Sequence, residues 1–446
     1  MPCGCISGSE ALRKFTNSTI RVAGVLLSGL TFVRTQAAPP RGNATAILER
    51  IRRQAIDQIN KSANYTCLQI TDRTYFRGRN VRQSACGSPG YPDRYEIMHD
   101  RLRLNVAVSK LGEVYSWRGE QQSSSSDIGT IVHGGPISSG NFVGFLRNVF
   151  LAKGVDFTYR GPYRERGSRG FRFDYSVPQP VSRFLVKGGE NKSAIVAYHG
   201  SFTADQATFQ LIKLQIIADD IPPAIGICTS SNEVLYQFVP ISGTLALIPR
   251  FFRLELSDRT HIDTVSKSEY ADCHEFQVRS TLRFDGAEKT MEAGLPESTE
   301  AWVPANILLK IALIGKIDEK RAFTGDEIQG RVIEDARDHH DAMAVPAGAL
   351  VRGVISQLQR FYVPQNFCAV QIQFTQVSFG GKTYRMRTVH DLSSAEKKDA
   401  KWLLEEAREA GEAAPLRAGV IAFHAPRVVL DSTFQGTWRT LAPKGP

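Results

Sequence analysis

Two runs of alternating apolar residues, separated by a short polar turn, constrain the fold of this chain more than any other feature. Residues 195–219 read IVAYHGSFTADQATFQLIKLQIIAD. The alternating positions are Val196, Tyr198, Gly200 and Phe202 before the turn, and Ile212, Leu214, Ile216 and Ala218 after it. Alternation with a period of two is typical of strands in a sheet with one covered face. Asp205 and Thr208 can bond the backbone of the turn, so we expect an antiparallel hairpin.

Length and charge set the class of protein. A chain of 446 residues that is 42% hydrophobic can bury a substantial core, and its length predicts about two or three domains. The net charge is +10, but the basic residues are scattered singly, as at Arg94, Arg118 and Arg147. Such a distribution indicates a solvated basic surface, and we expect no nucleic acid partner.

The N-terminus has the pattern of an export signal. Arg13, Lys14 and Arg21 precede an apolar run at Val22–Val33. The run is followed by small residues, which are typical of a cleavage site, near Ala37. The run is too short to span a bilayer. We predict a signal peptide at 1–37 and a periplasmic mature protein; an uncleaved anchor is the alternative.

Export changes the interpretation of the cysteines. The residues that remain after cleavage are Cys67, Cys86, Cys228, Cys273 and Cys368. An oxidising compartment allows two disulfides and one free thiol, but spacing alone does not determine the connectivity. Cys67 and Cys273 lie in strand-like segments and are equally compatible with small buried hydrophobic residues.

Periodicity predicts a mainly β protein with flanking helices, of the α+β class. One helix is expected at 44–61 and another at 141–153, because apolar residues recur there at helical spacing. Short links rich in glycine and proline favour an antiparallel meander. Strands are expected at 65–76, 95–108, 113–117, 157–161, 171–177, 184–187, 234–239, 251–256 and 275–284, besides the hairpin.

Four segments carry a resemblance to a known superfamily. They are YTCLQ (Tyr65–Gln69), DRLRLNVAV (Asp100–Val108), VYSW (Val114–Trp117) and the hairpin sequence Tyr198–Leu214. With the order of helix, meander and inserted helix, they resemble the periplasmic lipoprotein-sorting carriers, the superfamily of LolA and RseB, and more closely a set of uncharacterised secreted bacterial proteins. The resemblance implies an antiparallel half-barrel over 38–285 whose concave apolar face is covered by helices.

The C-terminal part is predicted to form a second domain. After a linker at 286–302, short strands fill 303–446, and Gly380-Gly381 is a hairpin signal. The glycine pattern at Phe323–Ile355 resembles the small β-barrel of type IV secretion bridging proteins. A helical insertion is expected at 393–411, where Ser393 and Glu396 have capping-box spacing. This helix is either a solvated surface helix or a docking element for a partner.

Catalytic and metal-binding patterns are weak. No serine lies in a GxSxG motif, and Gly381-Lys382-Thr383 lacks the first glycine of a phosphate loop. The best metal candidate is His339-His340 with the neighbouring Asp335, Asp338 and Asp341, although a polar loop tip explains it equally simply. We therefore predict no catalytic residue, no metal and no cofactor, and a protein that is not an enzyme.

The resemblance implies that the concave face binds an apolar ligand: an acyl chain, a lipidated protein or an apolar peptide. The predicted ligand-binding residues are Leu102, Leu104, Val106, Phe145, Phe150, Tyr198, Phe202, Ile212, Leu214 and Ile216. The same residues would also serve as a packed core, and an open cavity between sheet and helices would distinguish the two interpretations. The alternative function is a structural or assembly protein of the cell envelope that docks a partner through the C-terminal domain, with peripheral membrane contact allowed. An enzyme with an unrecognised site is the third.

Overall fold

The computed structural model describes residues 41–61, 64–78, 86, 94–109, 112–118, 125–132, 134–165, 167–188, 192–275, 301–363, 365–393, 396–397 and 418–443. The predicted signal peptide lies outside these residues. Most of the predicted linker at 286–302 and most of the predicted insertion at 393–411 also lie outside them. Ser393 and Glu396 are described: each backbone N–H donates to the other's side chain, as the predicted capping box requires.

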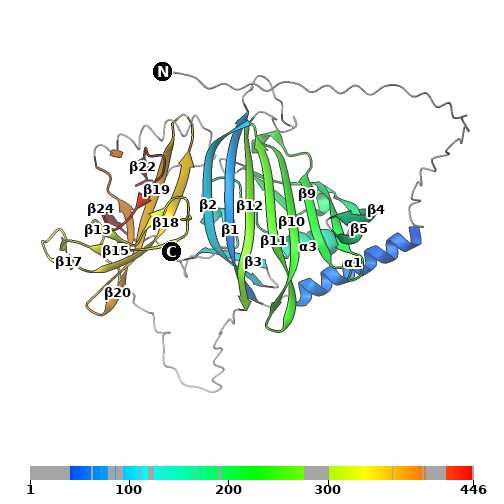
Figure 1. Cartoon of the computed structure of the whole chain (residues 1–446), viewed down its shortest axis with the longest axis horizontal. Coiled ribbons are helices and arrows are strands. Elements are labelled where there is room, and N and C mark those ends of the chain that lie inside the picture. Colours follow the sequence, from blue (N-terminus) through cyan, green and yellow to red (C-terminus); the bar gives the residue numbers. More distant parts are fainter. Residues whose placement is uncertain are drawn as a thin grey trace, which may run out of the picture. The chain divides into compact units, whose positions relative to one another are not determined.

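An open antiparallel sheet forms the first part of the chain, which confirms the predicted half-barrel. Its strands are β1 (Tyr65–Gly78), β2 (Arg94–Ser109), β3 (Gly112–Trp117), β4 (Asp156–Glu165), β5 (Ser168–Val177), β8 (Tyr198–Asp205), β9 (Leu211–Ala218), β10 (Ile227–Ile241), β11 (Thr244–Asp258) and β12 (Ile262–Glu275). They pair in the order β3-β2-β1-β12-β11-β10-β9-β8-β5-β4, without closing into a full barrel. The long strands β1, β2, β10, β11 and β12 lie next to one another in Figure 1.

Helices fill one end of the concave face. The helix α1 (Arg41–Lys61) buries a stripe of apolar residues, and α3 (Gly144–Phe150) contacts it. The buried residues of the two helices are Ile47, Ile51, Ala55, Ile59, Phe145, Leu146, Val149 and Phe150, all in the main core cluster of the half-barrel. A third helix, α2 (Ile128–Ile131), is one turn long. The second predicted helix is thus present but shorter than 141–153.

The predicted hairpin is formed by β8 and β9. Asp205 accepts hydrogen bonds from the backbone N–H of Ala207 and Thr208 and from the Thr208 hydroxyl, at 2.8–3.0 Å, so the turn forms as predicted. Val196 does not extend β8. It ends a separate strand, β7 (Ser193–Val196), which pairs with β6 (Phe184–Lys187).

The strand β12 was not predicted, and the predicted strand at 275–284 lies, apart from Glu275, outside the described residues. The structure has β12 at Ile262–Glu275. The buried positions Thr264, Ser266 and Ser268 of β12 are polar. Because these buried positions are polar, β12 lacks the apolar alternation by which a strand is identified from sequence.

The C-terminal part forms a small β-barrel. Its strands are β13 (Leu308–Ile314), β14 (Ile317–Asp318), β15 (Glu327–Val332), β16 (Ala336–Arg337), β17 (Met343–Val345), β18 (Leu350–Phe361), β19 (Phe367–Phe379), β20 (Lys382–Arg385), β21 (Arg387–His390), β22 (Ile421–Phe423), β23 (Val429–Leu430) and β24 (Gln435–Leu441). The ring runs β13–β15–β18–β19. The consecutive strands β20 and β21 both bond to β19, and β21 pairs with β24, which returns to β13. Trp438 of β24 is fully buried and donates to the carbonyl of Ile372 at 3.1 Å, so the last strand packs into the core of this barrel.

Strand pairing joins the small barrel to the half-barrel. Residues 359–361 of β18 pair antiparallel with residues 98–100 of β2. Beside them, the backbone of Thr324 bonds to that of Arg101 and Arg103 at 2.8 Å. A separate hydrophobic cluster combines residues from both parts: Tyr75, Ile97, Met98, Ile262, Phe361, Phe367, Ala369 and Val420. The two predicted domains therefore share a sheet and a small core.

Two disulfides cross-link the half-barrel. Cys67 in β1 is bonded to Cys273 in β12, and Cys86 to Cys228 in β10. Cys368 is free and buried. This is the allowed arrangement of two disulfides and one thiol, with a connectivity that the sequence left open.

Candidate functional site

A cavity of about 850 Å³ lies against the concave face of the half-barrel. Its floor is formed by side chains of three neighbouring strands: Ser230 and Asn232 of β10, Leu254 and Leu256 of β11, and Thr264 of β12. Its other walls come from α2, residues 134–140, the start of α3, and β6. This volume lies in the range of protein sites for small molecules.

The predicted ligand-binding residues lie mainly beside this cavity, in the filled part of the half-barrel. Leu102, Leu104, Val106, Phe150, Tyr198, Phe202, Leu214 and Ile216 are buried in the main core cluster and do not line the cavity. Phe145 belongs to that cluster and also lines the cavity. Packing there is dense: the Phe202 ring meets the rings of Phe150 and Phe173 at centroid distances of 5.1 and 5.3 Å. For the eight residues away from the cavity, the geometry is that of a packed core.

Ile212 lies outside that core. The pairing of β8 with β9 shifts between Thr203 and Ala204, so that Lys213 pairs with Thr203 while Leu211 pairs with Ala204. Ile212 is left between them and is only partly buried, whereas Leu211 is buried in the core. A bulge of this kind changes which residues of a strand face inward, and simple alternation does not reveal it.

The floor of the cavity belongs to a polar half of the concave face. Ser230, Asn232 and Thr264 are 6, 1 and 3% exposed. The polar surface continues through the buried residues Ser266, Ser268, Gln69, Thr71 and Arg73 on β12 and β1. The resemblance had implied an apolar lining, and a search for apolar alternation passes over these positions. Their signal in the sequence is a polar alternation at 230, 232, 264, 266 and 268.

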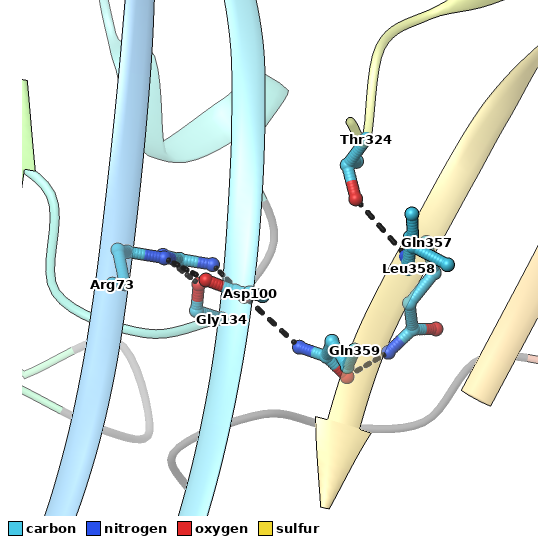
Figure 2. Close-up of polar contacts among 7 residues, drawn as sticks. All are labelled: Arg73, Asp100, Gly134, Thr324, Gln357, Leu358 and Gln359. Carbon is cyan, nitrogen blue, oxygen red and sulfur yellow. Dashed lines mark hydrogen bonds and ion pairs between the residues drawn. The ribbon is translucent and has the colours of Figure 1, made fainter. Parts of the chain in front are cut away.

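A buried ion pair holds one wall of the cavity (Figure 2). Arg73 donates through Nε and Nη2 to the two carboxylate oxygens of Asp100, at 2.8 and 2.6 Å, and through Nη1 to the carbonyl of Gly134 at 2.9 Å. Arg73 and Asp100 are 1 and 3% exposed. Burial and the Asp100 carboxylate act in opposite directions on the pKa of Arg73, and the net effect raises it. The guanidinium is therefore permanently charged, and it fixes the wall residue Gly134.

The same ion pair contacts the small barrel. Oδ2 of Asp100 also accepts from Nε2 of Gln359 on β18, at 3.2 Å, and Gln359 accepts from Gln357 at 2.7 Å. Figure 2 shows this chain of contacts running from Gly134 through Arg73 and Asp100 to β18. One charged pair thus contacts both a wall of the cavity and the small barrel.

Gly135 shows how closely that wall approaches the sheet. It has a φ of +73°, and a Cβ atom there would lie 1.9 Å from Oη of Tyr75 and 2.7 Å from Nη1 of Arg73. Residues other than glycine have neither the space nor the preferred backbone conformation at this position.

Glu113 of β3 anchors the start of α3. Its carboxylate is 8% exposed and accepts the backbone N–H of Gly140, Phe142 and Val143 at 2.8, 3.0 and 3.4 Å, together with the hydroxyl of Tyr115. Burial and the nearby Glu113 carboxylate raise the pKa of Tyr115, so its hydroxyl keeps the proton that it donates. The anchor places Phe145, one turn further on, at the cavity.

Replacing Glu113 by glutamine should lower the free energy of unfolding by about 1–3 kcal/mol, because an amide cannot replace a carboxylate that accepts several hydrogen bonds. Urea unfolding measures the loss, and hydrogen exchange should become faster at the amides of Phe142 and Val143. Glu165→Gln is the matched control, since Glu165 accepts from Tyr163 on an exposed hairpin. Equal losses of unfolding free energy in the two variants would show that the Glu113 carboxylate does not anchor the start of α3.

Charged side chains line the cavity only away from its floor. Lys187 bonds to Asp127 at 2.5 Å, and this contact is the main reason that the pKa of Asp127 is lowered. Arg183 and Arg259 are exposed. Asp258 accepts two backbone N–H groups and the hydroxyl of Thr260.

The metal candidate has the geometry of a loop tip. Asp338 accepts the backbone N–H of His340 and Ala342 at 2.8 and 3.0 Å, and these bonds lower its pKa. In the described ranges, no three His, Cys, Asp or Glu residues form a group that could hold a metal ion.

His199 is exposed and bonds to Asp219 at 2.6 Å. No helix in the part of the chain that the structure describes is long and apolar enough to cross a membrane.

Comparisons with known proteins find similarity at the level of solved structures. No protein-family model matches the chain, and no curated protein matches it. A LolA superfamily protein from Nitrosomonas europaea is 12% identical, with 53% of this chain and 94% of that chain covered and a TM-score of 0.24. A DUF1329 family protein from Desulfovibrio piger is 11% identical, with 53% and 93% covered and a TM-score of 0.24.

The lipoprotein LppX from Mycobacterium tuberculosis is also similar. It is 11% identical, with 52% of this chain and 97% of that chain covered and a TM-score of 0.19. The superfamily to which the sequence shows a resemblance is thus also named among the structural matches. The resemblance of the C-terminal barrel to type IV secretion bridging proteins stays a prediction.

Proposed function

We propose that this protein is a non-enzymatic binding protein of the bacterial cell envelope, which holds an apolar or amphiphilic ligand in the cavity of its half-barrel. The observation that carries the proposal is the cavity itself. Helices and aromatic side chains fill the other end of the concave face, whereas about 850 Å³ remains between the floor strands and the wall at 134–140. Leu254, Leu256 and Phe145 line this space and offer apolar contact.

The disulfides support the proposed location. Four of the five described cysteines are paired, and paired cysteines persist in oxidising compartments such as the periplasm. Export through a signal peptide at 1–37 belongs to the same proposal.

The first test is native mass spectrometry with lipid extraction on the protein purified from a bacterial periplasm. We expect a co-purifying acyl-chain compound, or an apolar peptide, at one molecule per chain. A mass without ligand, together with no uptake of an added apolar probe, would contradict the proposal. It would favour the alternative of an envelope assembly protein, which crosslinking through the C-terminal barrel would then examine.

The second test introduces a charge into the cavity. Leu256→Arg should weaken binding of the neutral probe N-phenyl-1-naphthylamine at least about tenfold, since an unpaired charge against an apolar ligand costs more than the 1.4 kcal/mol that corresponds to a factor of ten. Leu245→Arg is the matched control, because Leu245 lies on the same strand, is 56% exposed and does not line the cavity. Unchanged probe binding in Leu256→Arg would exclude this cavity as the site.

A further inference from the structure

The floor of the cavity combines a leucine stripe with uncharged polar borders. Leu254 pairs with Asn232 on one side, and Leu256 pairs with Thr264 on the other. Ser230, which pairs with Leu256, extends the polar border on β10. A molecule that lies on this floor therefore meets apolar side chains in the middle and hydrogen-bonding groups at both edges.

Asn232 borders this space and has an unused hydrogen-bonding group. The residue is 1% exposed and lines the cavity, and its Oδ1 atom has no hydrogen-bond partner among the described residues. Buried side-chain polar atoms are nearly always bonded, because an unsatisfied one retains the full cost of desolvation. A partner supplied from the cavity would satisfy Asn232.

The distribution of charge narrows the chemistry of that partner. No residue of the floor is charged, and the charged lining residues lie just before α2, on or just before β6, and at the end of β11 or just after it. An amide such as that of Asn232 offers one acceptor and two donors to a neutral group. A carboxylate or phosphate against this floor would be buried without a charged partner, which is costly.

Building on the proposed function, we propose that the cavity selects an amphiphile with an uncharged hydroxyl- or amide-bearing group. That group bonds to Asn232 and its neighbours Ser230 and Thr264, while the apolar body of the ligand packs on Leu254 and Leu256. Asn232 is then the residue that determines specificity. The protein should therefore distinguish a fatty acid, its methyl ester and its monoacylglycerol of the same chain length.

Three probes of one chain length test this selection by displacement of N-phenyl-1-naphthylamine. They are 1-monolauroylglycerol, methyl laurate and laurate, which differ in whether the head group is a hydroxyl donor, a neutral acceptor or a charge. We expect 1-monolauroylglycerol to bind about tenfold more tightly than methyl laurate, as one or two satisfied hydrogen bonds would produce. Laurate should bind more weakly than 1-monolauroylglycerol.

Two variants connect the preference to Asn232. Asn232→Leu has a similar shape and should abolish the preference for 1-monolauroylglycerol while retaining the probe. Thr203→Val is the matched control: Thr203 is also buried with an unpartnered side-chain oxygen, but it does not line the cavity, so the preference should persist. If Asn232→Leu does not fold, the preference for 1-monolauroylglycerol is tested instead with Ser230→Ala and with the three lauroyl compounds on the wild type.

The outcomes test the selection for a neutral polar group separately from the proposed binding function. Equal affinities for the three probes, or tighter binding of laurate, would overturn the selection for a neutral polar group but leave the binding function in place. A preference that survives in Asn232→Leu would exclude Asn232 as its source. Failure of the wild type to bind the naphthylamine probe and all three lauroyl compounds would contradict the proposed function itself.

Discussion

Replacing Asp100 by alanine should lower the free energy of unfolding by about 3–5 kcal/mol, because it leaves the Arg73 guanidinium buried without its counter-ion. Arg73 is 1% exposed and has no route to solvent at this position. The change also removes the acceptor of Gln359 on β18. Urea unfolding of the wild type and the variant, followed by tryptophan fluorescence, measures the loss.

Two controls isolate the charge. Asp174→Ala removes a carboxylate that pairs with Arg160 on the surface, where the side chains are 33 and 56% exposed, and it should cost no more than about 1 kcal/mol. The double change Arg73→Met with Asp100→Leu should recover part of the loss, since it removes both buried charges. If Asp100→Ala costs no more than Asp174→Ala, the ion pair does not hold the wall of the cavity or the attachment of the small barrel.

Replacing Cys67 and Cys273 by alanine should lower the free energy of unfolding by about 2–5 kcal/mol. The bond joins residues 206 apart in sequence, and it links β1 to β12, which pair along most of their length. A cross-link between distant residues restricts the unfolded chain, so its loss favours unfolding. Cys67 is fully buried, which adds a smaller packing cost.

Reduction provides the control for this second prediction. In a variant with Cys86 and Cys228 changed to alanine, dithiothreitol should lower the urea midpoint, because Cys67–Cys273 is then the only disulfide among the described cysteines. The variant that lacks all four cysteines should not respond. Burial raises the pKa of the Cys368 thiol, so this residue should stay unreactive in the folded protein. Identical midpoints with and without dithiothreitol would argue against the bond.

The regular elements were predicted most closely where contacts between near neighbours determine them. The strand β6 forms at Phe184–Lys187, as the alternation predicted, and α1 contains the predicted helix at 44–61. The turn at Asp205 and the capping box of Ser393 and Glu396 involve atoms within a few residues of one another. Such features depend on residue type and spacing alone, which a sequence displays directly.

The candidate site was harder to predict, because it depends on which distant strands lie beside one another. Apart from Ile212, the predicted residues of β8, β9 and α3 do face inward, but sequence does not tell whether the space between them is filled. The polar strand β12 was not predicted, and its face of the cavity was missed for the same reason: Thr264 and Ser266 carry no apolar signal.

The amino-acid sequence by itself therefore determined the open antiparallel sheet, its covering helices and the chemistry of its turns, since period and spacing are local properties of the chain. Only the tertiary structure decided the cysteine pairing, the Arg73–Asp100–Gln359 contact and the location of the cavity. Residues 27 and 259 positions apart form that contact. They meet because strand register brings them together, and register is a property of the assembled sheet.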